Sequence, residues 1–216
     1  MDSKRYIEGL ERAGREDYKH YAPMRVTVPC GKSGPWTVRK FRTEMGIEYL
    51  RLARDGRPSG IGEFTALSHE RRGIVMSDTI PEIDDLRPYR HSLRGNVLIS
   101  GLGLGMVVHI LTKIKQHSDV LTSITVLEKD ADVIALTADH YRKSDPRVTV
   151  IHADALAWTP PKGSVYDAAW HDIWDEICED NRPQMTALRR RYQRHVAAGQ
   201  QYCWGQMYLD AERRRA

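Results

Sequence analysis

The sequence is poor in cysteine and in long apolar runs. Its three cysteines, Cys30, Cys178 and Cys203, are odd in number, far apart and in no paired motif. They predict neither a disulfide framework nor a cysteine-based zinc site. No stretch approaches the roughly 18 consecutive apolar residues that span a bilayer. The charged start, residues 1–5, lacks the apolar core of a secretion signal. We therefore expect a cytoplasmic protein without a membrane segment.

An excess of one charge is also lacking, because 33 basic residues stand against 29 acidic ones and give a formal net charge of +4. The pI of about 9.0 allows contact with nucleic acid but does not require it. Hydrophobic residues make up 41% of the 216, which is enough for a packed core and excludes a disordered or fibrous chain. The length suits one globular domain with an appendage.

Residues 1–90 predict an N-terminal helix followed by a small antiparallel β element. The charged stretch 1–23 has helical spacing of its apolar residues. After it, short β-prone runs alternate with Gly, Pro and Ser, which is typical of three to five antiparallel strands. These runs are 25–28, 36–41, 63–67 and 73–76. Pro81 and Pro88 bracket a short turn or helix that leads out of this element.

Residues 91–216 predict an α/β domain with a Rossmann-like, doubly wound, mostly parallel sheet. The expected strands are 97–100, 123–127, 148–151, 166–170 and 201–204, and the expected helices are 106–114, 131–140 and 182–197. Their alternation favours right-handed crossovers, and we expect the strand order 3-2-1-4-5. The fifth strand is expected to end near Trp204 or Met207, and about nine residues follow Met207, so we expect a sheet shortened at its C-terminal end. An exposed sheet edge is commonly covered by a partner, which predicts a homodimer.

The strongest motif is a glycine-rich turn, Gly101-Leu102-Gly103-Leu104-Gly105, between the first parallel strand and the next helix. Glycine lets the backbone approach a ligand where a Cβ would clash. The helix start behind it offers free N–H groups, and ligands bind at this crevice in doubly wound sheets. A tight structural turn would produce the same pattern, so the motif needs its context.

Two acidic residues supply that context. Glu128 closes the second strand, where a carboxylate accepts hydrogen bonds from ribose hydroxyls. Asp154 follows the third strand, next to the small Ala155, and suits the exocyclic amine of an adenine. Three such features at successive strand ends favour a nucleoside-type cofactor. Met106 stands where a dinucleotide motif needs Gly or Ala, which argues against NAD, and Val26 breaks the P-loop suggested by residues 31–33.

These segments resemble the successive motifs of class I S-adenosylmethionine-dependent methyltransferases, and most closely the spermidine synthase-like branch. The resembling segments are 97–105, 126–130, 154–155 and 166–172. The resemblance implies that S-adenosylmethionine is the cofactor. The methionine moiety would lie over the glycine turn, Glu128 would hold the ribose, and Asp154 with Ala155 would face the adenine. The implied cofactor-binding residues are Gly101, Leu102, Gly103, Gly105, Glu128, Lys129, Asp154, Ala155 and Asp172.

The end of the fourth strand is where this resemblance places the substrate chemistry. Asp172 and Asp175 keep the spacing of two aspartates in aminopropyltransferases, and a carboxylate there can accept the proton of a reacting amine. The neighbours of these aspartates differ from those in that family. Leu104 stands where the family has an acid in the glycine motif, and Val75 stands where it has a glutamine of its polyamine site. Those departures weaken the case for a polyamine pocket.

Three further residues at this strand end are candidates. Trp174 suggests a flat substrate or the adenine stacking on an aromatic face, whereas Trp170 is expected in the strand core. His171 beside Asp172 suggests a base with its orienting acid, although adjacent strand residues point to opposite faces. The prolines that amino-methyltransferases place after this acid are missing, which argues against DNA-base methylation. The candidate catalytic residues are therefore Asp172, His171 and Asp175, with Trp174 on the substrate side.

A basic stretch at 188–195 carries four arginines and a tyrosine that could contact RNA phosphates. An ordinary solvated helix face produces the same pattern and is the favoured interpretation. No metal site is predicted. Our expectation is methyl transfer from S-adenosylmethionine to an unidentified small-molecule acceptor. The alternatives are aminopropyl transfer from the decarboxylated donor, or a cofactor-binding partner subunit without catalysis.

Overall fold

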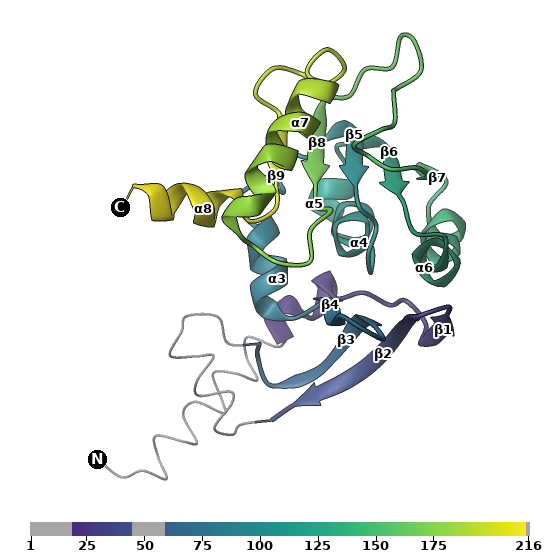
Figure 1. Cartoon of the computed structure of the whole chain (residues 1–216). Helices are drawn as coiled ribbons and strands as arrows, with labels where there is room; N and C mark the ends of the chain where they lie inside the picture. Colours follow the sequence, from purple (N-terminus) through teal and green to yellow (C-terminus); the bar gives the residue numbers. More distant parts are fainter. Residues whose placement is uncertain (1–18, 45–58, 215–216) are drawn as a thin grey trace.

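The computed structural model describes residues 19–44 and 59–214, which form two β-sheets with helices packed around them (Figure 1). In chain order the elements are η1 (Ala22–Met24), β1 (Gly31–Ser33), β2 (Trp36–Thr43), β3 (Gly62–His69), β4 (Gly73–Ser77), α3 (Ile80–Leu86), β5 (Gly95–Ser100), α4 (Met106–Lys113), α5 (Lys115–Ser118), β6 (Leu121–Glu128), α6 (Ala131–Ser144), β7 (Val148–His152), β8 (Ala168–His171), η2 (Glu179–Asn181), α7 (Arg182–Tyr192), β9 (Gln201–Cys203) and α8 (Gln206–Arg213). Most of the helix predicted over residues 1–23 lies outside the described residues.

Five parallel strands form the larger sheet, in the order β7-β6-β5-β8-β9. In its central strand β5 the consecutive residues Val97, Leu98 and Ile99 are all buried, as expected for a strand covered on both faces. Val97 and Ile99 pack with α4 and α6 on one face, whereas Leu98 packs with α7 on the other. The prediction of an α/β fold with a parallel sheet is confirmed.

The smaller sheet is antiparallel, with the order β1-β2-β3-β4. Three of the four strands predicted in this region lie within β2, β3 and β4, but the strand predicted at 25–28 is wrong. In this segment the Val26 backbone N–H donates to the Asp78 carboxylate at 3.2 Å instead of joining a ladder. Val26 and Val28 are nevertheless buried, which explains their β-like composition.

The C-terminal part differs from expectation in two ways. The helix predicted to reach residue 197 ends at Tyr192, because the chain turns there and Val196 bridges to Tyr166 beside the sheet. Helix α8, which was not predicted, follows β9. In the described part of the chain, no helix is long and apolar enough to cross a membrane.

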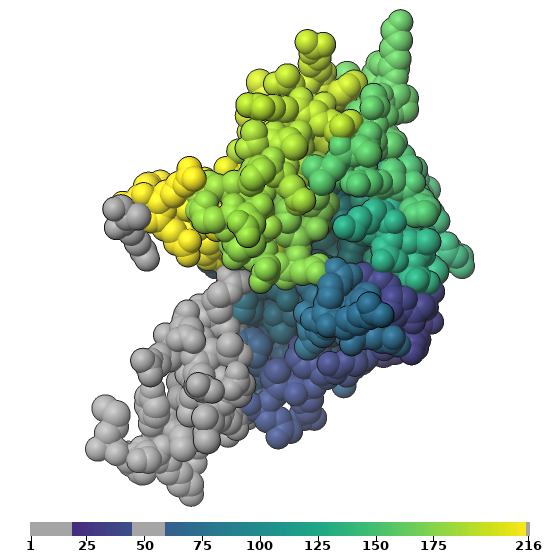
Figure 2. Space-filling model, in the orientation of Figure 1, coloured from purple at the N-terminus to yellow at the C-terminus, as the bar shows by residue number. Residues whose placement is uncertain are grey.

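The two sheets meet at the start of α6. The Ser33 hydroxyl donates to Asp132 at 2.7 Å, and the Trp36 indole N–H donates to Asp130 at 2.7 Å. Asp130 is also the N-cap of α6, where its side chain accepts from two backbone N–H groups. Figure 2 shows the purple and blue surface of the antiparallel sheet adjoining the teal and green surface of the parallel-sheet half. The antiparallel sheet therefore forms a wall beside the carboxyl ends of the parallel strands.

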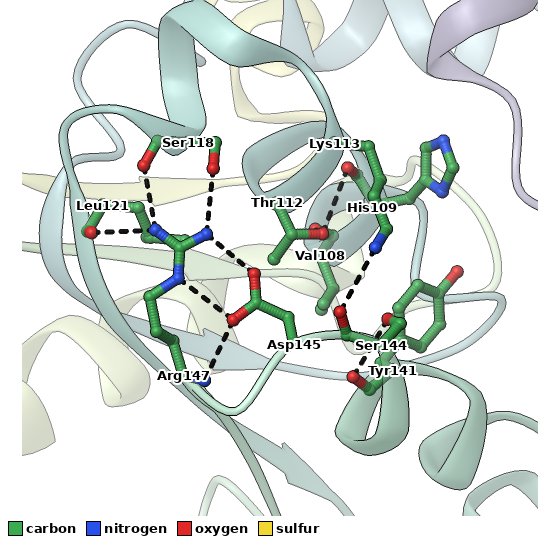
Figure 3. A network of polar contacts seen from close by, with 10 residues as sticks. All are labelled: Val108, His109, Thr112, Lys113, Ser118, Leu121, Tyr141, Ser144, Asp145 and Arg147. Atoms are coloured by element: carbon green, nitrogen blue, oxygen red, sulfur yellow. Dashed lines mark hydrogen bonds and ion pairs between the residues drawn. The ribbon is translucent and has the colours of Figure 1, made fainter.

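An ion-pair network lies at the amino ends of the parallel strands (Figure 3). Arg147 donates to both carboxylate oxygens of Asp145, and to the carbonyls of Ser118 and Leu121. The Arg147 guanidinium lowers the pKa of Asp145. This network joins the segments that enter β6 and β7, so it stabilises the sheet at the end away from the glycine turn.

Candidate active site

A cavity lies where the carboxyl ends of β5 to β8 face the antiparallel sheet. Its floor includes the glycine turn Gly101–Gly103, and the ends of β6, β7 and β8 contribute Glu128, Ala155 and Asp172. The wall from the antiparallel half includes Trp36 and Met76. The parallel topology explains why residues far apart in the sequence meet here, since the carboxyl ends of parallel strands share one edge.

The first residue of the turn must be glycine because the backbone at the end of β8 passes close to it. Gly101 has φ of +93°, and a Cβ there would lie 1.8 Å from the Asp172 carbonyl oxygen. The Asp172 N–H donates to the Ser100 carbonyl at 2.8 Å, so this carbonyl is held in place. The glycine turn and the end of β8 are therefore packed directly against each other.

Met76 of β4 lies against the second glycine of the turn. A Cβ on Gly103 would lie 2.5 Å from the Met76 sulfur, and that sulfur accepts the Leu104 N–H at 3.3 Å. Gly105 instead faces Tyr141 of α6 and does not line the cavity. Its predicted contact with a cofactor is not supported by this position, since its role is to let α4 start close to α6.

Glu128 is fixed at the cavity edge by two backbone N–H groups. Its Oε2 accepts from Leu102 at 2.8 Å, and its Oε1 accepts from Asp130 at 2.9 Å. The residue is buried, with 8% of its surface exposed. A carboxylate has about four lone-pair sites, so two acceptor positions remain for hydroxyl groups in the cavity. Glu128 thus couples the glycine turn to the second parallel strand while facing the cavity.

The predicted residues of β6 and β7 lie along the same cavity. Lys129 and Asp154 are exposed at its edge, and Ala155 is buried. Asp154 accepts the Leu156 N–H at 2.8 Å, which forms a tight turn and fixes its carboxylate. The small Ala155 side chain leaves room beside this turn. Together these residues make a polar edge next to an apolar floor.

Asp172 faces the cavity from the end of β8. Burial raises the pKa of its carboxyl to about 8, and the negative charges of Glu82, Asp85 and Glu128 add to that effect. The Trp170 indole N–H acts in the opposite direction and lowers this pKa. A carboxyl group with a pKa near neutrality is suited to exchanging a proton with a ligand.

His171 does not reach the cavity, because its side chain points to the opposite face of β8. Its Nδ1 lies 2.9 Å from the Ser100 hydroxyl, its Nε2 lies 3.2 Å from Gln201, and its ring stacks on Tyr192. The imidazole is fully buried, and burial lowers its pKa to about 4. The expectation that His171 serves as a base beside Asp172 is thus corrected: it is a neutral core residue.

Asp175, the other candidate catalytic acid, lies at the rim of the cavity. It forms a 2.6 Å ion pair with Arg72, and each side chain is 41% exposed. The Arg72 guanidinium also lies 4.6 Å above the Trp36 ring. This contact bridges the antiparallel sheet and the segment after β8. The geometry therefore supports a structural role for Asp175 rather than a role in proton transfer. Trp174 lines the cavity, and its indole donates to Gln184 at 2.7 Å.

Several cavity residues were not predicted from the sequence. Trp36, Arg72, Met76 and Glu82 come from the antiparallel half and α3, and Trp204 directly follows β9. The pattern from Thr79 to Glu82 is a readable signal for a helix start, because Ser or Thr followed three residues later by Glu is a capping motif. It indicates the start of α3 but not the approach of Glu82 to Asp172.

The four arginines within residues 189–194 do not form one free basic surface. Arg189 donates to Gln206, and Arg191 donates to the carbonyls of Ala157 and Trp158. Arg190 and Arg194 are exposed. Contact with nucleic acid through residues 189–194 stays an untested prediction. In the described ranges, no group of three or more His, Cys, Asp or Glu side chains is placed to hold a metal ion.

No family model matches the sequence, and no curated protein is significantly similar to it. Solved structures with partial likeness include the N-methyltransferase NodS from Bradyrhizobium japonicum WM9, at 15% identity and a TM-score of 0.40, covering 55% of this chain and 64% of that one. The StiE O-methyltransferase, residues 942–1257, has 17% identity and a TM-score of 0.41, with coverage of 55% and 39%. The plantazolicin methyltransferase BpumL, in complex with SAH, has 13% identity and a TM-score of 0.35, with coverage of 53% and 41%. In each case the chain spans less than two thirds of the other protein.

Proposed function

We propose that the chain binds S-adenosylmethionine in this cavity and transfers its methyl group to an acceptor at the Asp172 end. The observation that carries the proposal is the position of Glu128. Its buried carboxylate is held by Leu102 of the glycine turn and by Asp130, and it still faces the cavity. That arrangement suits two neighbouring hydroxyl groups of a ribose.

The order of the strand ends along the cavity matches the order of the three parts of the cofactor, which supports the proposal. Along the sheet edge, Ala155 after β7 comes first, then Glu128 of β6, then Gly101 after β5, then Asp172 after β8. Adenine, ribose and methionine follow one another in the same order along the cofactor. We therefore assign the adenine to Asp154 and Ala155, and the methionine part to the glycine turn.

Bound S-adenosylmethionine would supply an electrophilic methyl group on a positively charged sulfur. The residues of this chain would bind and orient both reactants, which supplies much of the rate acceleration in such transfers. Asp172 would hold the acceptor and, in its ionised form, take a proton from it; the raised pKa makes that carboxylate a stronger base. The Arg72–Asp175 ion pair and the Trp36 ring would limit the entry of water at the rim.

Titration calorimetry of the purified chain tests this proposal. S-adenosylmethionine and S-adenosylhomocysteine should bind with micromolar affinity, and NAD should not bind. Glu128→Gln should weaken S-adenosylhomocysteine binding at least tenfold, which corresponds to the loss of about 1.4 kcal/mol. Glu70→Gln is the matched control, because Glu70 pairs with Lys32 on the exposed surface and should leave the affinity unchanged. Failure of both sulfur nucleosides to bind would refute the proposal.

Aminopropyl transfer is a second candidate, and the negative charge around Asp172 favours it. Glu82 and Asp85 act on Asp172 with the same sign, and a decarboxylated donor brings no further carboxylate to this end. Decarboxylated S-adenosylmethionine in the same titration separates the two functions. Tighter binding of that donor than of S-adenosylmethionine would move the assignment to aminopropyl transfer.

A further inference from the structure

Trp36, the first residue of β2, reaches from the antiparallel sheet to the loop that follows β6. Its indole N–H donates to Asp130 Oδ2 at 2.7 Å. Strands β1 and β2 pack against α6, which begins directly after this loop (Figure 1). Hydrogen bonds to carboxylate oxygens are among the stronger ones in proteins. The antiparallel half thus holds a residue of the loop that lines the cavity.

Asp130 is held through both oxygens of its side chain. Its Oδ1 accepts the backbone N–H of Asp132 at 2.9 Å and that of Val133 at 3.4 Å, while Oδ2 accepts the indole N–H of Trp36. The backbone N–H of the same residue donates to Glu128 Oε1 at 2.9 Å. Because the side chain is fixed from two sides, the direction of this backbone N–H is fixed with it.

These contacts join into one chain of hydrogen bonds that ends at the glycine turn. Glu128 Oε1 accepts from Asp130, and Glu128 Oε2 accepts the Leu102 N–H at 2.8 Å. A carboxylate held by one N–H alone turns more freely about its last bond than a carboxylate held at both oxygens. Sites bind precisely when the groups that touch the ligand are themselves fixed by a second set of hydrogen bonds. The orientation of the Glu128 carboxylate therefore depends on Asp130, and through it on Trp36.

The Trp36 ring is itself fixed by the antiparallel half. The residue is 5% exposed and lies opposite His69 in the β2–β3 ladder. The His69 ring meets it edge-on, with the ring centroids 4.9 Å apart, and the Arg72 guanidinium lies 4.6 Å above it. The direction of the indole N–H is therefore set by packing within the antiparallel half and does not require a ligand.

From this geometry we propose that Trp36 is a positioning residue of the cofactor site. Its indole N–H holds Asp130, and Asp130 orients the Glu128 carboxylate toward the two hydroxyl groups of the cofactor ribose. The inference rests on the proposed function for the identity of the ligand. It gives the antiparallel sheet a part in recognising the ribose, in addition to forming a wall of the cavity.

Calorimetric titration of the full chain with S-adenosylhomocysteine and its 2′,3′-dideoxy analogue tests the inference. The analogue lacks the hydroxyl groups that Glu128 would accept, so the ratio of the two affinities reports on this contact alone. The unsubstituted chain should prefer S-adenosylhomocysteine by at least about tenfold, the size expected for hydrogen bonds to a charged group. Trp36→Phe removes the indole N–H but keeps an aromatic ring, and it should reduce this preference to about threefold or less.

A double variant tests whether Trp36 acts through Glu128. Glu128→Gln alone should remove most of the preference for the ribose hydroxyls. Trp36→Phe added to Glu128→Gln should then leave the affinity ratio unchanged, because the carboxylate that Trp36 orients is already gone. A further fall of the ratio in the double variant would overturn the inference.

Ser33→Ala is the matched control. The Ser33 hydroxyl donates to the Asp132 side chain at 2.7 Å, so its loss removes a bond of equal length between the antiparallel sheet and the start of α6 without touching Asp130. This variant should keep the full preference for the hydroxyl groups. Loss of the preference in Ser33→Ala would overturn the inference, because looser packing of the two halves would then explain the effect.

Asp130→Asn decides the question if Trp36→Phe fails to fold. Asparagine remains a good N-cap for α6, but its single oxygen replaces only one of the two carboxylate oxygens, so the contact with Trp36 or with α6 is lost. The preference should again fall to about threefold or less.

The remaining outcomes separate the inference from the proposed function. An unchanged affinity ratio in Trp36→Phe would overturn the inference and leave the proposed function standing. Equal weakening of both ligands would do the same, because it would make Trp36 only a wall of the cavity. Failure of the unsubstituted chain to bind S-adenosylhomocysteine would reject the proposed function, and the inference with it.

Discussion

Substitution of Gly101 by alanine tests whether the glycine turn is set by contact with β8 or only by its backbone angle. Gly101 has φ of +93°, and a Cβ would lie 1.8 Å from the Asp172 carbonyl oxygen. Gly163 offers a matched control, because its φ is +88° and a Cβ there would meet nothing within 4 Å. The two substitutions therefore share the backbone strain and differ in the clash.

The expected magnitudes follow from these two terms. Alanine at a positive φ costs about 1–2 kcal/mol in the free energy of unfolding, which is the whole effect expected for Gly163→Ala. Gly101→Ala adds the overpacking against a carbonyl that cannot swing away, and such overpacking costs about 1–3 kcal/mol or more. The gap between the variants should be about 2 kcal/mol. For a chain of this size, that gap corresponds to about 4–8 °C in Tm.

Thermal unfolding followed by circular dichroism measures the gap directly. S-adenosylhomocysteine titration of both variants then shows whether the binding site is disturbed, which we expect for Gly101→Ala alone. Equal melting temperatures for the two variants would refute the close approach of the turn to β8. A normal affinity in a destabilised Gly101→Ala protein would separate the turn from ligand binding.

Two further predictions concern the rim and the core. Arg72→Ala should speed S-adenosylhomocysteine dissociation about two- to fivefold in stopped-flow fluorescence, because a half-exposed ion pair is worth at most about 1 kcal/mol. Asp175→Asn should speed dissociation to the same extent, and the double variant should dissociate no faster than either single variant. Additive effects would contradict a role of the two residues as one ion pair. His171→Asn should make the free energy of unfolding less sensitive to acid. The pKa of His171 is about 4 in the folded chain and 6.5 in the unfolded chain, so the neutral imidazole contributes its full stability above pH 6.5. That contribution is lost as the pH falls towards 4, and the loss is about 2 kcal/mol at pH 5. Urea unfolding of both proteins at pH 7 and pH 5 measures the difference, and an unchanged pH dependence in His171→Asn would argue against a neutral buried imidazole.

The parallel half of the fold was predictable because its signals are local. Apolar runs such as 97–100 have the length and composition of buried strands, and the glycine motif at 101–105 fixes where one strand ends. The strand predicted at 25–28 is wrong because the β-prone composition of this segment reflects burial, while the Val26 N–H donates to Asp78 instead of a neighbouring strand. Composition reports burial well, but it does not report which group takes a backbone hydrogen bond.

The residues of the candidate site also fall into those that a local sequence pattern predicts and those that only tertiary packing brings to the cavity. Glu128, Asp154 and Asp172 were predicted because each lies at or just after the end of a parallel strand, and topology alone brings strand ends together. Met76 and Glu82 were missed because they reach the cavity only through the docking of the antiparallel sheet and α3, which no local pattern encodes. His171 was placed wrongly for a related reason: the alternation of side chains along β8 gives the cavity to Asp172 and the opposite face to its neighbour.

The contact between Gly101 and Asp172 links the two ends of the proposed reaction. The Asp172 N–H donates to Ser100, its carbonyl lies against Gly101, and Asp172 lines the cavity together with Glu82. The turn that would hold the donor and the carboxylate that would hold the acceptor are therefore parts of one rigid unit. A displacement of either part would change the distance between the two reactants, and transfer rates fall steeply when reacting groups are misplaced by as little as about 1 Å. This coupling predicts that a substitution of Gly101 would disturb the acceptor side of the proposed site as well as its cofactor side.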